Sequence, residues 1–297
     1  MPVDHRLVAV GRLAGSVASG SVPKVRLIAC DLDGTLLRSD RTLSSRTLTA
    51  LRIAREAGVA TAVATGRPRY IAEDLARDCG VEFGVYMNGT QTVRVHDHLI
   101  LRDHLLSPGH AYTGIEAARE LVPDAGTSVE FADHTLLYEP GFLDMIPLPP
   151  PPDVSVEVER VDRTMLRQPV RKLSVYTHAL DVEDLLDLLA FGLPPHLAAS
   201  HAGLPFAELG APGVSKATSL AWLVTELGGT AADVVVFGDE RNDHEMIVWA
   251  GCGVAMGNAD AVTRSLADVV AETNDEDGVA RIIEDIAADG WMVPGAH

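Results

Sequence analysis

Asp31-Leu32-Asp33-Gly34-Thr35 is the most informative stretch of this 297-residue chain, because it follows directly on the apolar run Val-Arg-Leu-Ile-Ala-Cys at residues 25–30. A short apolar run that ends in such a turn is typical of a buried strand in a parallel sheet. Two ionised aspartates at one strand end would repel each other, and a divalent cation would relieve that repulsion. The alternative interpretation is a simple turn in which Gly34 supplies a positive φ.

Strands and helices alternate on both sides of a long middle region. After the first strand, a helix capped by Ser44 or Ser45 ends at Gly58, and a second strand leads to a helix that starts near Pro68 and ends at Gly80. The same alternation returns from about residue 210, with helices at 216–227, 243–249 and 279–286 and strands at 234–237 and 253–256. This pattern predicts an α/β fold with a Rossmann-like, doubly wound parallel sheet.

The middle region has a different rhythm, with strands expected at 128–130, 135–138, 154–158 and 173–177 and helices at 115–121 and 182–190. Because the core pattern brackets it, we interpret it as an inserted α/β cap domain. Its proline run, residues 147–152, is expected to be an extended loop. The predicted organisation is a tail at 1–24, a discontinuous core at 25–89 and 208–290, a cap at 90–207 and a tail at 291–297.

Composition narrows the class of partner. Lys and Arg number 24 against 42 Asp and Glu, a net charge of -18, which disfavours binding to nucleic acid or to an anionic membrane. Three cysteines without metal-site spacing indicate free thiols in a reducing compartment. No apolar stretch is long enough to span a membrane, so we expect a cytoplasmic protein. The sequence does not predict an oligomeric state.

Four segments that follow predicted strands or start a predicted helix carry the polar chemistry. They are Asp31 to Thr35, Thr65-Gly66-Arg67, Ser215-Lys216 and Gly238-Asp239-Glu-Arg-Asn242-Asp243. The carboxyl ends of parallel strands meet at one edge of a sheet, so these segments should converge. Asp239 and Asp243 would join Asp31 and Asp33 in an oxygen-only ligand set that suits Mg²⁺, although Asp243 alone could be a helix cap.

Other polar residues could receive a phosphate. A cation at a helix start, such as Lys216, is disfavoured by the helix dipole unless an anion is bound nearby. The hydroxyl of Thr65 and the N–H groups after it could hold a phosphoryl oxygen, or Thr65 could simply be a turn residue. Arg67 and Asn88 could face the cleft, and they could equally be a surface salt-bridging arginine and a turn asparagine.

The order and types of these residues resemble the haloacid dehalogenase-like (HAD) hydrolase superfamily. Asp-x-Asp-Gly-Thr at 31–35 resembles its first motif, Thr65 its second, Lys216 its third, and Gly238-Asp239-x-x-Asn242-Asp243 its fourth. The resemblance extends over about residues 25–287. Within the superfamily it narrows to the Cof-type phosphatases, which carry a C2-type α/β cap. That subgroup is indicated by Asn88-Gly89, Gly213-Val-Ser-Lys216, Ala255-Met-Gly-Asn-Ala259 and Asp277-Gly-Val-Ala280.

The resemblance implies a Mg²⁺-dependent phosphatase that acts on phosphate monoesters of small metabolites, with sugar phosphates the first expectation. Asp31 would be the nucleophile that forms an aspartyl-phosphate, and Asp33 the general acid and base. Mg²⁺ would be held by Asp31, the backbone carbonyl of Asp33, Asp239 and Asp243. Thr65 and Lys216 would hold phosphoryl oxygens, and the full predicted substrate-binding set is Thr65, Gly66, Arg67, Asn88, Lys216 and Asn242.

Two other functions remain open from the sequence. A phosphomutase of the same superfamily would share the aspartyl-phosphate but return the phosphate to a bound sugar. A catalytically silent phosphate-binding protein would keep the fold without turnover. Against this alternative, all four motifs named above carry their expected polar residues in this sequence. The identity of the phosphorylated substrate is not predicted.

Overall fold

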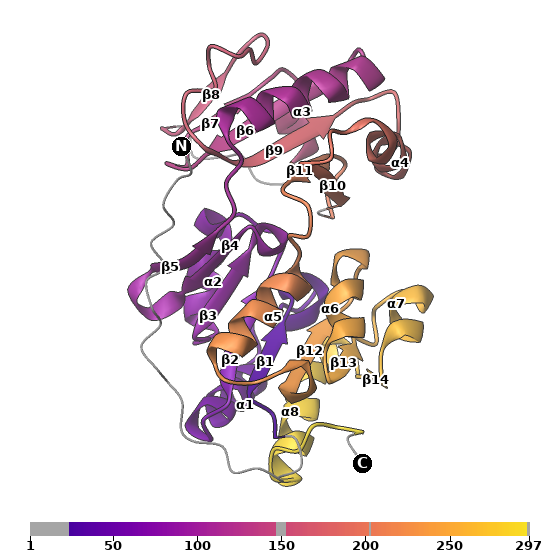
Figure 1. The fold of residues 1–297 in the computed structure, drawn as a ribbon. Coiled ribbons are helices and arrows are strands. Elements are labelled where there is room, and N and C mark those ends of the chain that lie inside the picture. Colours follow the sequence, from indigo (N-terminus) through magenta and orange to yellow (C-terminus); the bar gives the residue numbers. More distant parts are fainter. Residues whose placement is uncertain (1–23, 147–152, 202, 296–297) are drawn as a thin grey trace. The chain divides into compact units, whose positions relative to one another are not determined.

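The computed structural model describes residues 24–146, 153–201 and 203–295, so the predicted tail before residue 24 and the proline run at 147–152 lie outside the described residues. The chain divides into two compact units (Figure 1). The first unit comprises the chain up to Arg102 and from Ser215 onward, and the second is Asp103–Val214. Within the described ranges, no helix combines the length and the apolar character that a membrane span requires.

The first unit is built on an eight-stranded sheet. Its strands, in spatial order, are β14 (Val269–Val270), β13 (Cys252–Ala255), β12 (Val234–Gly238), β1 (Leu27–Cys30), β2 (Ala60–Ala64), β3 (Phe83–Tyr86), β4 (Gln91–Arg94) and β5 (Leu99–Asp103). From β14 to β3 all neighbours are parallel, and β4 adds to β3 in the antiparallel direction. The predicted parallel core is therefore present.

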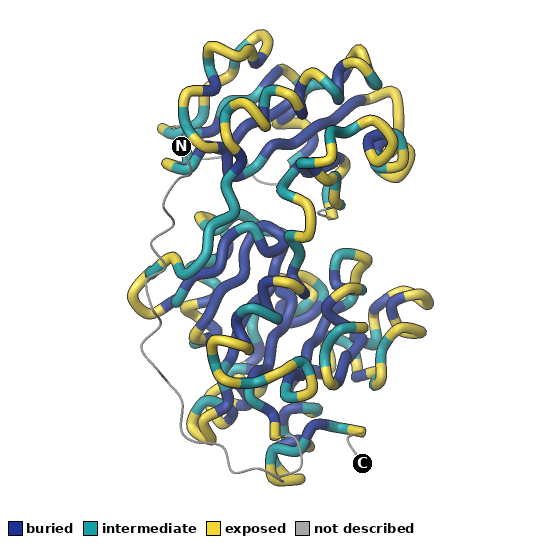
Figure 2. Tube along the Cα trace, viewed as in Figure 1, coloured by how far each residue is buried: buried dark blue, intermediate teal, exposed yellow. Residues whose placement is uncertain are grey.

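Helices cover both faces of this sheet, as a doubly wound fold requires. They are α1 (Ser45–Glu56), α2 (Arg69–Asp78), α5 (Lys216–Glu226), α6 (His244–Trp249), α7 (Ala261–Leu266) and α8 (Gly278–Ala288). Alternate residues of β1 point to opposite layers: Ile28 packs with α1, α2 and α8, whereas Leu27 packs with α5 and α6. Figure 2 shows the central strands as continuously buried. The continuous apolar runs in the sequence reflect this burial on two sides.

Local signals define the ends of several helices. The side chain of Ser44 accepts a hydrogen bond from the backbone N–H of Thr47 and so caps α1. Ser215 and Thr218 form a reciprocal capping box at the start of α5. These contacts place Lys216 in the first turn of α5, as the sequence predicted.

The second unit contains a six-stranded sheet with two helices packed on one face. The strands, in spatial order, are β10 (Ala198–His201), β11 (Ala207–Gly210), β9 (Val170–Tyr176), β6 (Gly126–Phe131), β7 (Leu136–Tyr138) and β8 (Ser155–Glu157), and the helices are α3 (Pro108–Leu121) and α4 (Val182–Gly192). Ile115 of α3 and Leu189 of α4 are fully buried against Leu173 of β9. A smaller cluster around Phe142, Tyr176 and Phe206 forms elsewhere in this unit.

The sequence predicted domain boundaries at residues 90 and 208. The two compact units instead divide after Arg102 and after Val214. At the first boundary the difference arises at β4 and β5, which the sequence did not predict and which extend the first sheet. Thr92 of β4 is fully buried there, opposite Val85 of β3. An antiparallel strand after the Asn88-Gly89 turn continues the first sheet, and the second unit begins only at Asp103, the last residue of β5.

Candidate active site

Four neighbouring parallel strands place the predicted site residues along one edge of the first sheet. Asp31 follows β1, Thr65 follows β2, Asn88 follows β3 and Asp239 follows β12. Since these strands are adjacent in the order β12, β1, β2, β3 and run in the same direction, their carboxyl ends lie together. Segments separated by up to two hundred residues are thereby brought to one place.

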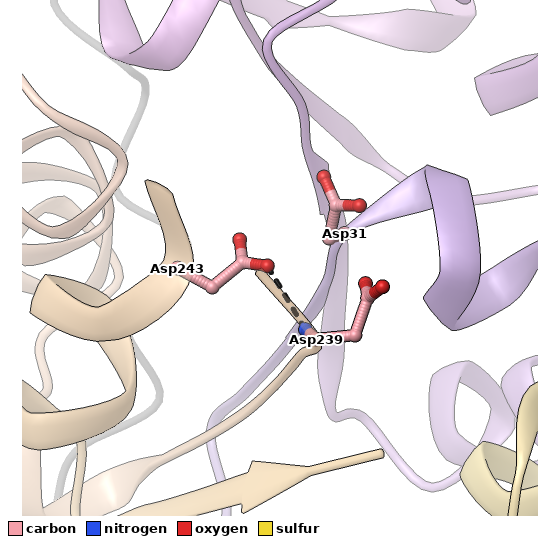
Figure 3. Close-up of side chains that lie close together, drawn as sticks. All are labelled: Asp31, Asp239 and Asp243. Atoms are coloured by element: carbon pink, nitrogen blue, oxygen red, sulfur yellow. Dashed lines mark hydrogen bonds between the residues drawn. The ribbon is translucent and has the colours of Figure 1, made fainter. Parts of the chain in front are cut away.

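Three carboxylates form a tight group at this edge. Oxygen atoms of Asp31, Asp239 and Asp243 lie within 4.8 Å of one another (Figure 3). Asp31 and Asp243 are buried, and Asp239 is partly exposed. Three mutually repelling carboxylates at this spacing require positive charge nearby.

Lys216 supplies one positive charge. Its Nζ donates to Oδ1 of Asp31 at 2.8 Å and to Oδ1 of Asp243 at 2.7 Å. The lysine is only 1% exposed, so its charge acts in a region largely without water. One ammonium against three carboxylates leaves a negative surplus, and that surplus favours a cation.

Burial is the largest influence on the pKa values of Asp31 and Asp239. Burial, together with the nearby Asp243 and Asp239, raises the pKa of Asp31 to about 8, although Lys216 opposes the shift. Burial raises the pKa of Asp239 to about 7, against the lowering effect of its hydrogen bond from Thr35. Burial alone would lower the pKa of Lys216, but Asp243 and Asp31 outweigh it and raise that pKa. Without a cation, Asp31 and Asp239 therefore bind protons more readily than ordinary aspartates.

The turn after β1 fits closely against Asp239. The hydroxyl of Thr35 donates to Oδ1 of Asp239 at 2.7 Å. Gly34 has φ +72°, and a Cβ at this position would lie 2.1 Å from Oδ2 of Asp239. Only glycine combines this backbone conformation with the close approach.

Asp243 organises the loop after β12. Its Oδ2 accepts hydrogen bonds from the backbone N–H groups of Asp239 and Glu240, at 3.0 and 3.1 Å. The first of these is the dashed line in Figure 3. A Cβ on Gly238 would lie 2.4 Å from the Cβ of Asp243, so the glycine gives the carboxylate its space. Asp243 therefore shapes the loop that carries Asp239 as well as contacting Lys216.

Asp33 is not one of the three clustered carboxylates, and its side chain pairs with Arg67. Arg67 Nε donates to Oδ2 of Asp33 at 2.6 Å, and Arg67 Nη2 donates to Oδ1 of the same carboxylate. The hydroxyl of Thr65 accepts from the backbone N–H of Arg67 at 3.1 Å, within the same turn. Of the two interpretations of Arg67, the structure shows a salt bridge, and its partner is a predicted site residue.

Asn88 and Asn242 also meet. The Asn242 amide donates to the Asn88 side-chain oxygen at 3.3 Å. Asn88 is buried with φ +52°, and its N–H donates to the carbonyl of Thr65. The neighbouring Gly89 packs directly on the carbonyl of Ser215, where a Cβ would lie at 2.2 Å. The Asn88-Gly89 turn is therefore part of the assembled edge.

The predicted residues gather in two sets. Asp31 lies with Lys216, Asp239 and Asp243. Asp33 pairs with Arg67, whose backbone reaches Thr65, and the Thr65 carbonyl accepts from Asn88, which contacts Asn242. Gly66 lies in the turn between Thr65 and Arg67. Thr35 and Asn258, whose amide donates to the carbonyl of Gly34 at 2.8 Å, were given no role from the sequence. Both lie in quoted motifs, but nothing local identifies their partners.

The donor set fits a hard divalent cation. Asp31, Asp239 and Asp243 offer oxygen ligands and no sulfur or imidazole, the chemistry that Mg²⁺ prefers. The raised pKa values of Asp31 and Asp239 show that their charges lack full compensation from the protein alone. This buried acidic cluster could therefore bind a metal ion.

Known proteins resemble this chain over most of its length. The phosphatase YcsE of Bacillus subtilis, named for 5-amino-6-(5-phospho-D-ribitylamino)uracil, is 29% identical over 87% of this chain and 94% of its own. The pyridoxal phosphate phosphatase YbhA of Escherichia coli is 28% identical over 87% of this chain and 97% of its own. The crystal structure of a haloacid dehalogenase-like hydrolase from Bacteroides thetaiotaomicron matches with a TM-score of 0.70 and 29% identity, covering 89% of this chain and all of that one.

The family model for haloacid dehalogenase-like hydrolases matches residues 28–283, which include all of the second unit, most of the first and every predicted site residue. The resemblance seen in the motifs at Asp31, Thr65, Lys216 and Asp239 is thus confirmed over nearly the whole chain. This protein belongs to the haloacid dehalogenase-like hydrolase family.

Proposed function

We propose that this protein is a Mg²⁺-dependent phosphatase that hydrolyses phosphate monoesters of small metabolites through a phosphorylated Asp31. The convergence of Asp31, Asp239 and Asp243 around the buried Lys216 supports this most directly. We also propose that the second unit, Asp103–Val214, serves as the cap domain of a Cof-type enzyme. The cytoplasmic location stays a prediction.

In the proposed reaction, a carboxylate oxygen of Asp31 attacks phosphorus, and the bond to the ester oxygen breaks. Asp33 gives its proton to the leaving oxygen. A water then attacks phosphorus, its proton passes to Asp33, and the bond between phosphorus and Asp31 breaks to release inorganic phosphate. Lys216 keeps Asp31 oriented and offsets the charge of the phosphoryl oxygens.

The proposed metal ligands are Asp31, the backbone carbonyl of Asp33, Asp239 and Asp243. When bound, Mg²⁺ would lower the repulsion between an anionic nucleophile and an anionic substrate. Thr65, Gly66, Arg67, Asn88 and Asn242 are proposed to contact the substrate or its phosphoryl group. Thr65 and Asn88 are buried at the same strand edge as Asp31, which supports their place in this set.

The first test is hydrolysis of p-nitrophenyl phosphate with Mg²⁺ and with EDTA. We expect turnover that depends on Mg²⁺ and falls by about 10³-fold or more in Asp31→Asn. Asp233→Asn is a matched control, because Asp233 precedes β12 at the opposite end of the strand that carries Asp239. It should keep wild-type turnover. Retained activity in a folded Asp31→Asn protein would refute the proposed nucleophile.

A second test addresses the substrate class and the two alternatives. A panel should include sugar phosphates, the first expectation from the motifs, together with pyridoxal phosphate and phosphorylated ribityl compounds, the esters named for the relatives. Stoichiometric release of inorganic phosphate supports a phosphatase. Transfer of the phosphate within a sugar without release would indicate a phosphomutase, and binding without turnover would indicate a silent phosphate-binding protein.

A further inference from the structure

The turn that carries both proposed catalytic aspartates has little internal support. We call residues 31–37 the aspartate turn. Two backbone bonds close it, Leu36 N–H to the carbonyl of Asp31 at 3.3 Å and Leu37 N–H to the carbonyl of Leu32 at 2.8 Å. Inside it, Asp33 and Gly34 depart from helical geometry. A turn of this kind needs contacts from outside to keep one conformation.

Two asparagines from distant segments provide such contacts. The Asn258 amide donates to the carbonyl of Gly34 at 2.8 Å, and the Asn274 amide donates to the carbonyl of Leu37 at 2.8 Å. The two residues are joined, because the backbone N–H of Asn274 donates to the side-chain oxygen of Asn258 at 3.1 Å. Together they form a bracket across the tip and the end of the aspartate turn.

The orientation of both amides follows from their partners. Asn258 lies between a backbone N–H, which can only donate, and a backbone carbonyl, which can only accept. Asn274 likewise faces the Leu37 carbonyl with its NH₂ group. Asparagine suits both positions, because its side chain carries a donor and an acceptor on one short stem.

The bracket affects two parts of the site, the Asp33 side chain and the contact between Thr35 and Asp239. Gly34 lies between Asp33 and Thr35 in the chain, and the hydroxyl of Thr35 donates a hydrogen bond to Asp239. Fixing this peptide group therefore fixes the direction of the Asp33 side chain and the approach of the turn to the carboxylate group. Asn258 follows β13 and Asn274 follows β14, so the last two strands on one side of the sheet would influence chemistry at the ends of β1 and β12.

We propose that Asn258 and Asn274 are positioning residues that hold the aspartate turn in its working conformation. This rests on the proposed function of Asp31 and Asp33. Neither asparagine needs to touch the substrate or the metal, since each acts through a backbone carbonyl of the turn. The bracket makes the loops after β13 and β14 part of the catalytic apparatus.

The substitutions can separate the contacts. Asn258→Asp keeps the acceptor for Asn274 N–H and removes the donor to Gly34, whereas Asn258→Ala removes both bonds. Asn274→Asp and Asn274→Ala test the Leu37 contact in the same way. If an added charge were the cause of an effect, only the aspartate variants would show it.

Asp260→Ala is the matched control, because Asp260 lies two residues beyond Asn258 and caps α7 through the N–H of Thr263 at 2.7 Å. It should destabilise the same segment without affecting the aspartate turn. In the Asn variants we expect kcat to fall by about 10-fold or more and the Mg²⁺ concentration for half-maximal activity to rise, with the KM for p-nitrophenyl phosphate nearly unchanged. Asp260→Ala should show none of these changes.

Hydrogen–deuterium exchange of the peptide that covers residues 31–38 provides a readout that needs neither activity nor metal. We expect faster exchange in all four Asn variants than in wild type and in Asp260→Ala. Unchanged exchange, or faster exchange with unchanged kcat, would overturn the positioning role, as would an equal loss of kcat in Asp260→Ala. An inactive wild-type protein would refute the proposed function instead, and the exchange data would still test the bracket.

Discussion

Arg67 holds both carboxylate oxygens of Asp33, with Nε 2.6 Å from Oδ2. The arginine comes from the turn after β2 and the aspartate from the turn after β1. A bidentate guanidinium fixes both the position and the orientation of a carboxylate. Asp33 is not one of the clustered carboxylates Asp31, Asp239 and Asp243, and Arg67 sets the direction of this proposed acid and base.

Replacing Arg67 should slow catalysis by loosening Asp33. We expect Arg67→Ala to lower kcat by about 10- to 100-fold, and Arg67→Lys to lower it less, because lysine retains the charge without the fork geometry. Steady-state kinetics with p-nitrophenyl phosphate measure this. If Arg67 acts through Asp33, adding Arg67→Ala to Asp33→Asn should reduce kcat little further. Independent, multiplicative losses would contradict the relationship.

Removing Lys216 should destabilise the metal-free protein. Lys216→Met leaves Asp31 and Asp243 buried without their counter-charge, which we expect to cost about 3 kcal/mol or more of unfolding free energy at pH 8. The loss should be smaller at pH 5, where Asp31, whose pKa is raised by burial, can bind a proton. Urea denaturation in EDTA gives both values. Arg52→Met removes an exposed ion pair with Glu56 and serves as a control with little effect.

The stability of the metal-free protein should fall as pH rises from 5 to 8. The pKa of Asp31 is raised to about 8 and that of Asp239 to about 7, from 3.8 in each case, so the folded chain binds more protons than the unfolded chain in this range. Unfolding free energy then decreases with pH. Thermal melts in EDTA should show this trend, and a rising midpoint would contradict it.

Mg²⁺ should reverse this trend. The cation binds only the deprotonated carboxylates, so the stabilisation that it adds should grow between pH 5 and 8. The measurement is the difference in thermal midpoint with and without Mg²⁺ at each pH. Asp239→Asn should lose most of this difference. A wild-type midpoint that does not respond to Mg²⁺ at pH 8 would speak against the proposed metal site.

Gly34 and Gly58 offer a matched pair for testing the close approach to Asp239. Both have positive φ, +72° and +83°, so an alanine costs about 1–3 kcal/mol of stability at either position. Only at Gly34 would the new Cβ meet Asp239, whereas nothing lies within 4 Å at Gly58. We expect Gly34→Ala to lose activity by about 100-fold or more. Gly58→Ala should remain active, and equal activities would contradict the structural interpretation.

Local sequence was enough to predict the core elements. Apolar runs before Asp31 and Asp239 marked β1 and β12, and Ser44 and Ser215 marked the starts of α1 and α5. These signals depend on residues a few positions apart, which set burial periodicity and capping. The same locality explains why β4 was missed, since its four residues, Gln91–Arg94, include only one apolar side chain and so give no apolar run like those of the central strands.

The sequence alone therefore determined the parallel core, the strand-end positions of Asp31 and Asp239, and the family. Tertiary structure alone decided that Arg67 pairs with Asp33, that Thr35 binds Asp239, and that Asn258 reaches Gly34. The reason is physical. The backbone and apolar pattern of nearby residues specify an element. These three side-chain contacts instead join separate segments, 34 residues apart for Arg67 and Asp33 and more than two hundred for the other two, so they form only once packed strands bring the partners within reach.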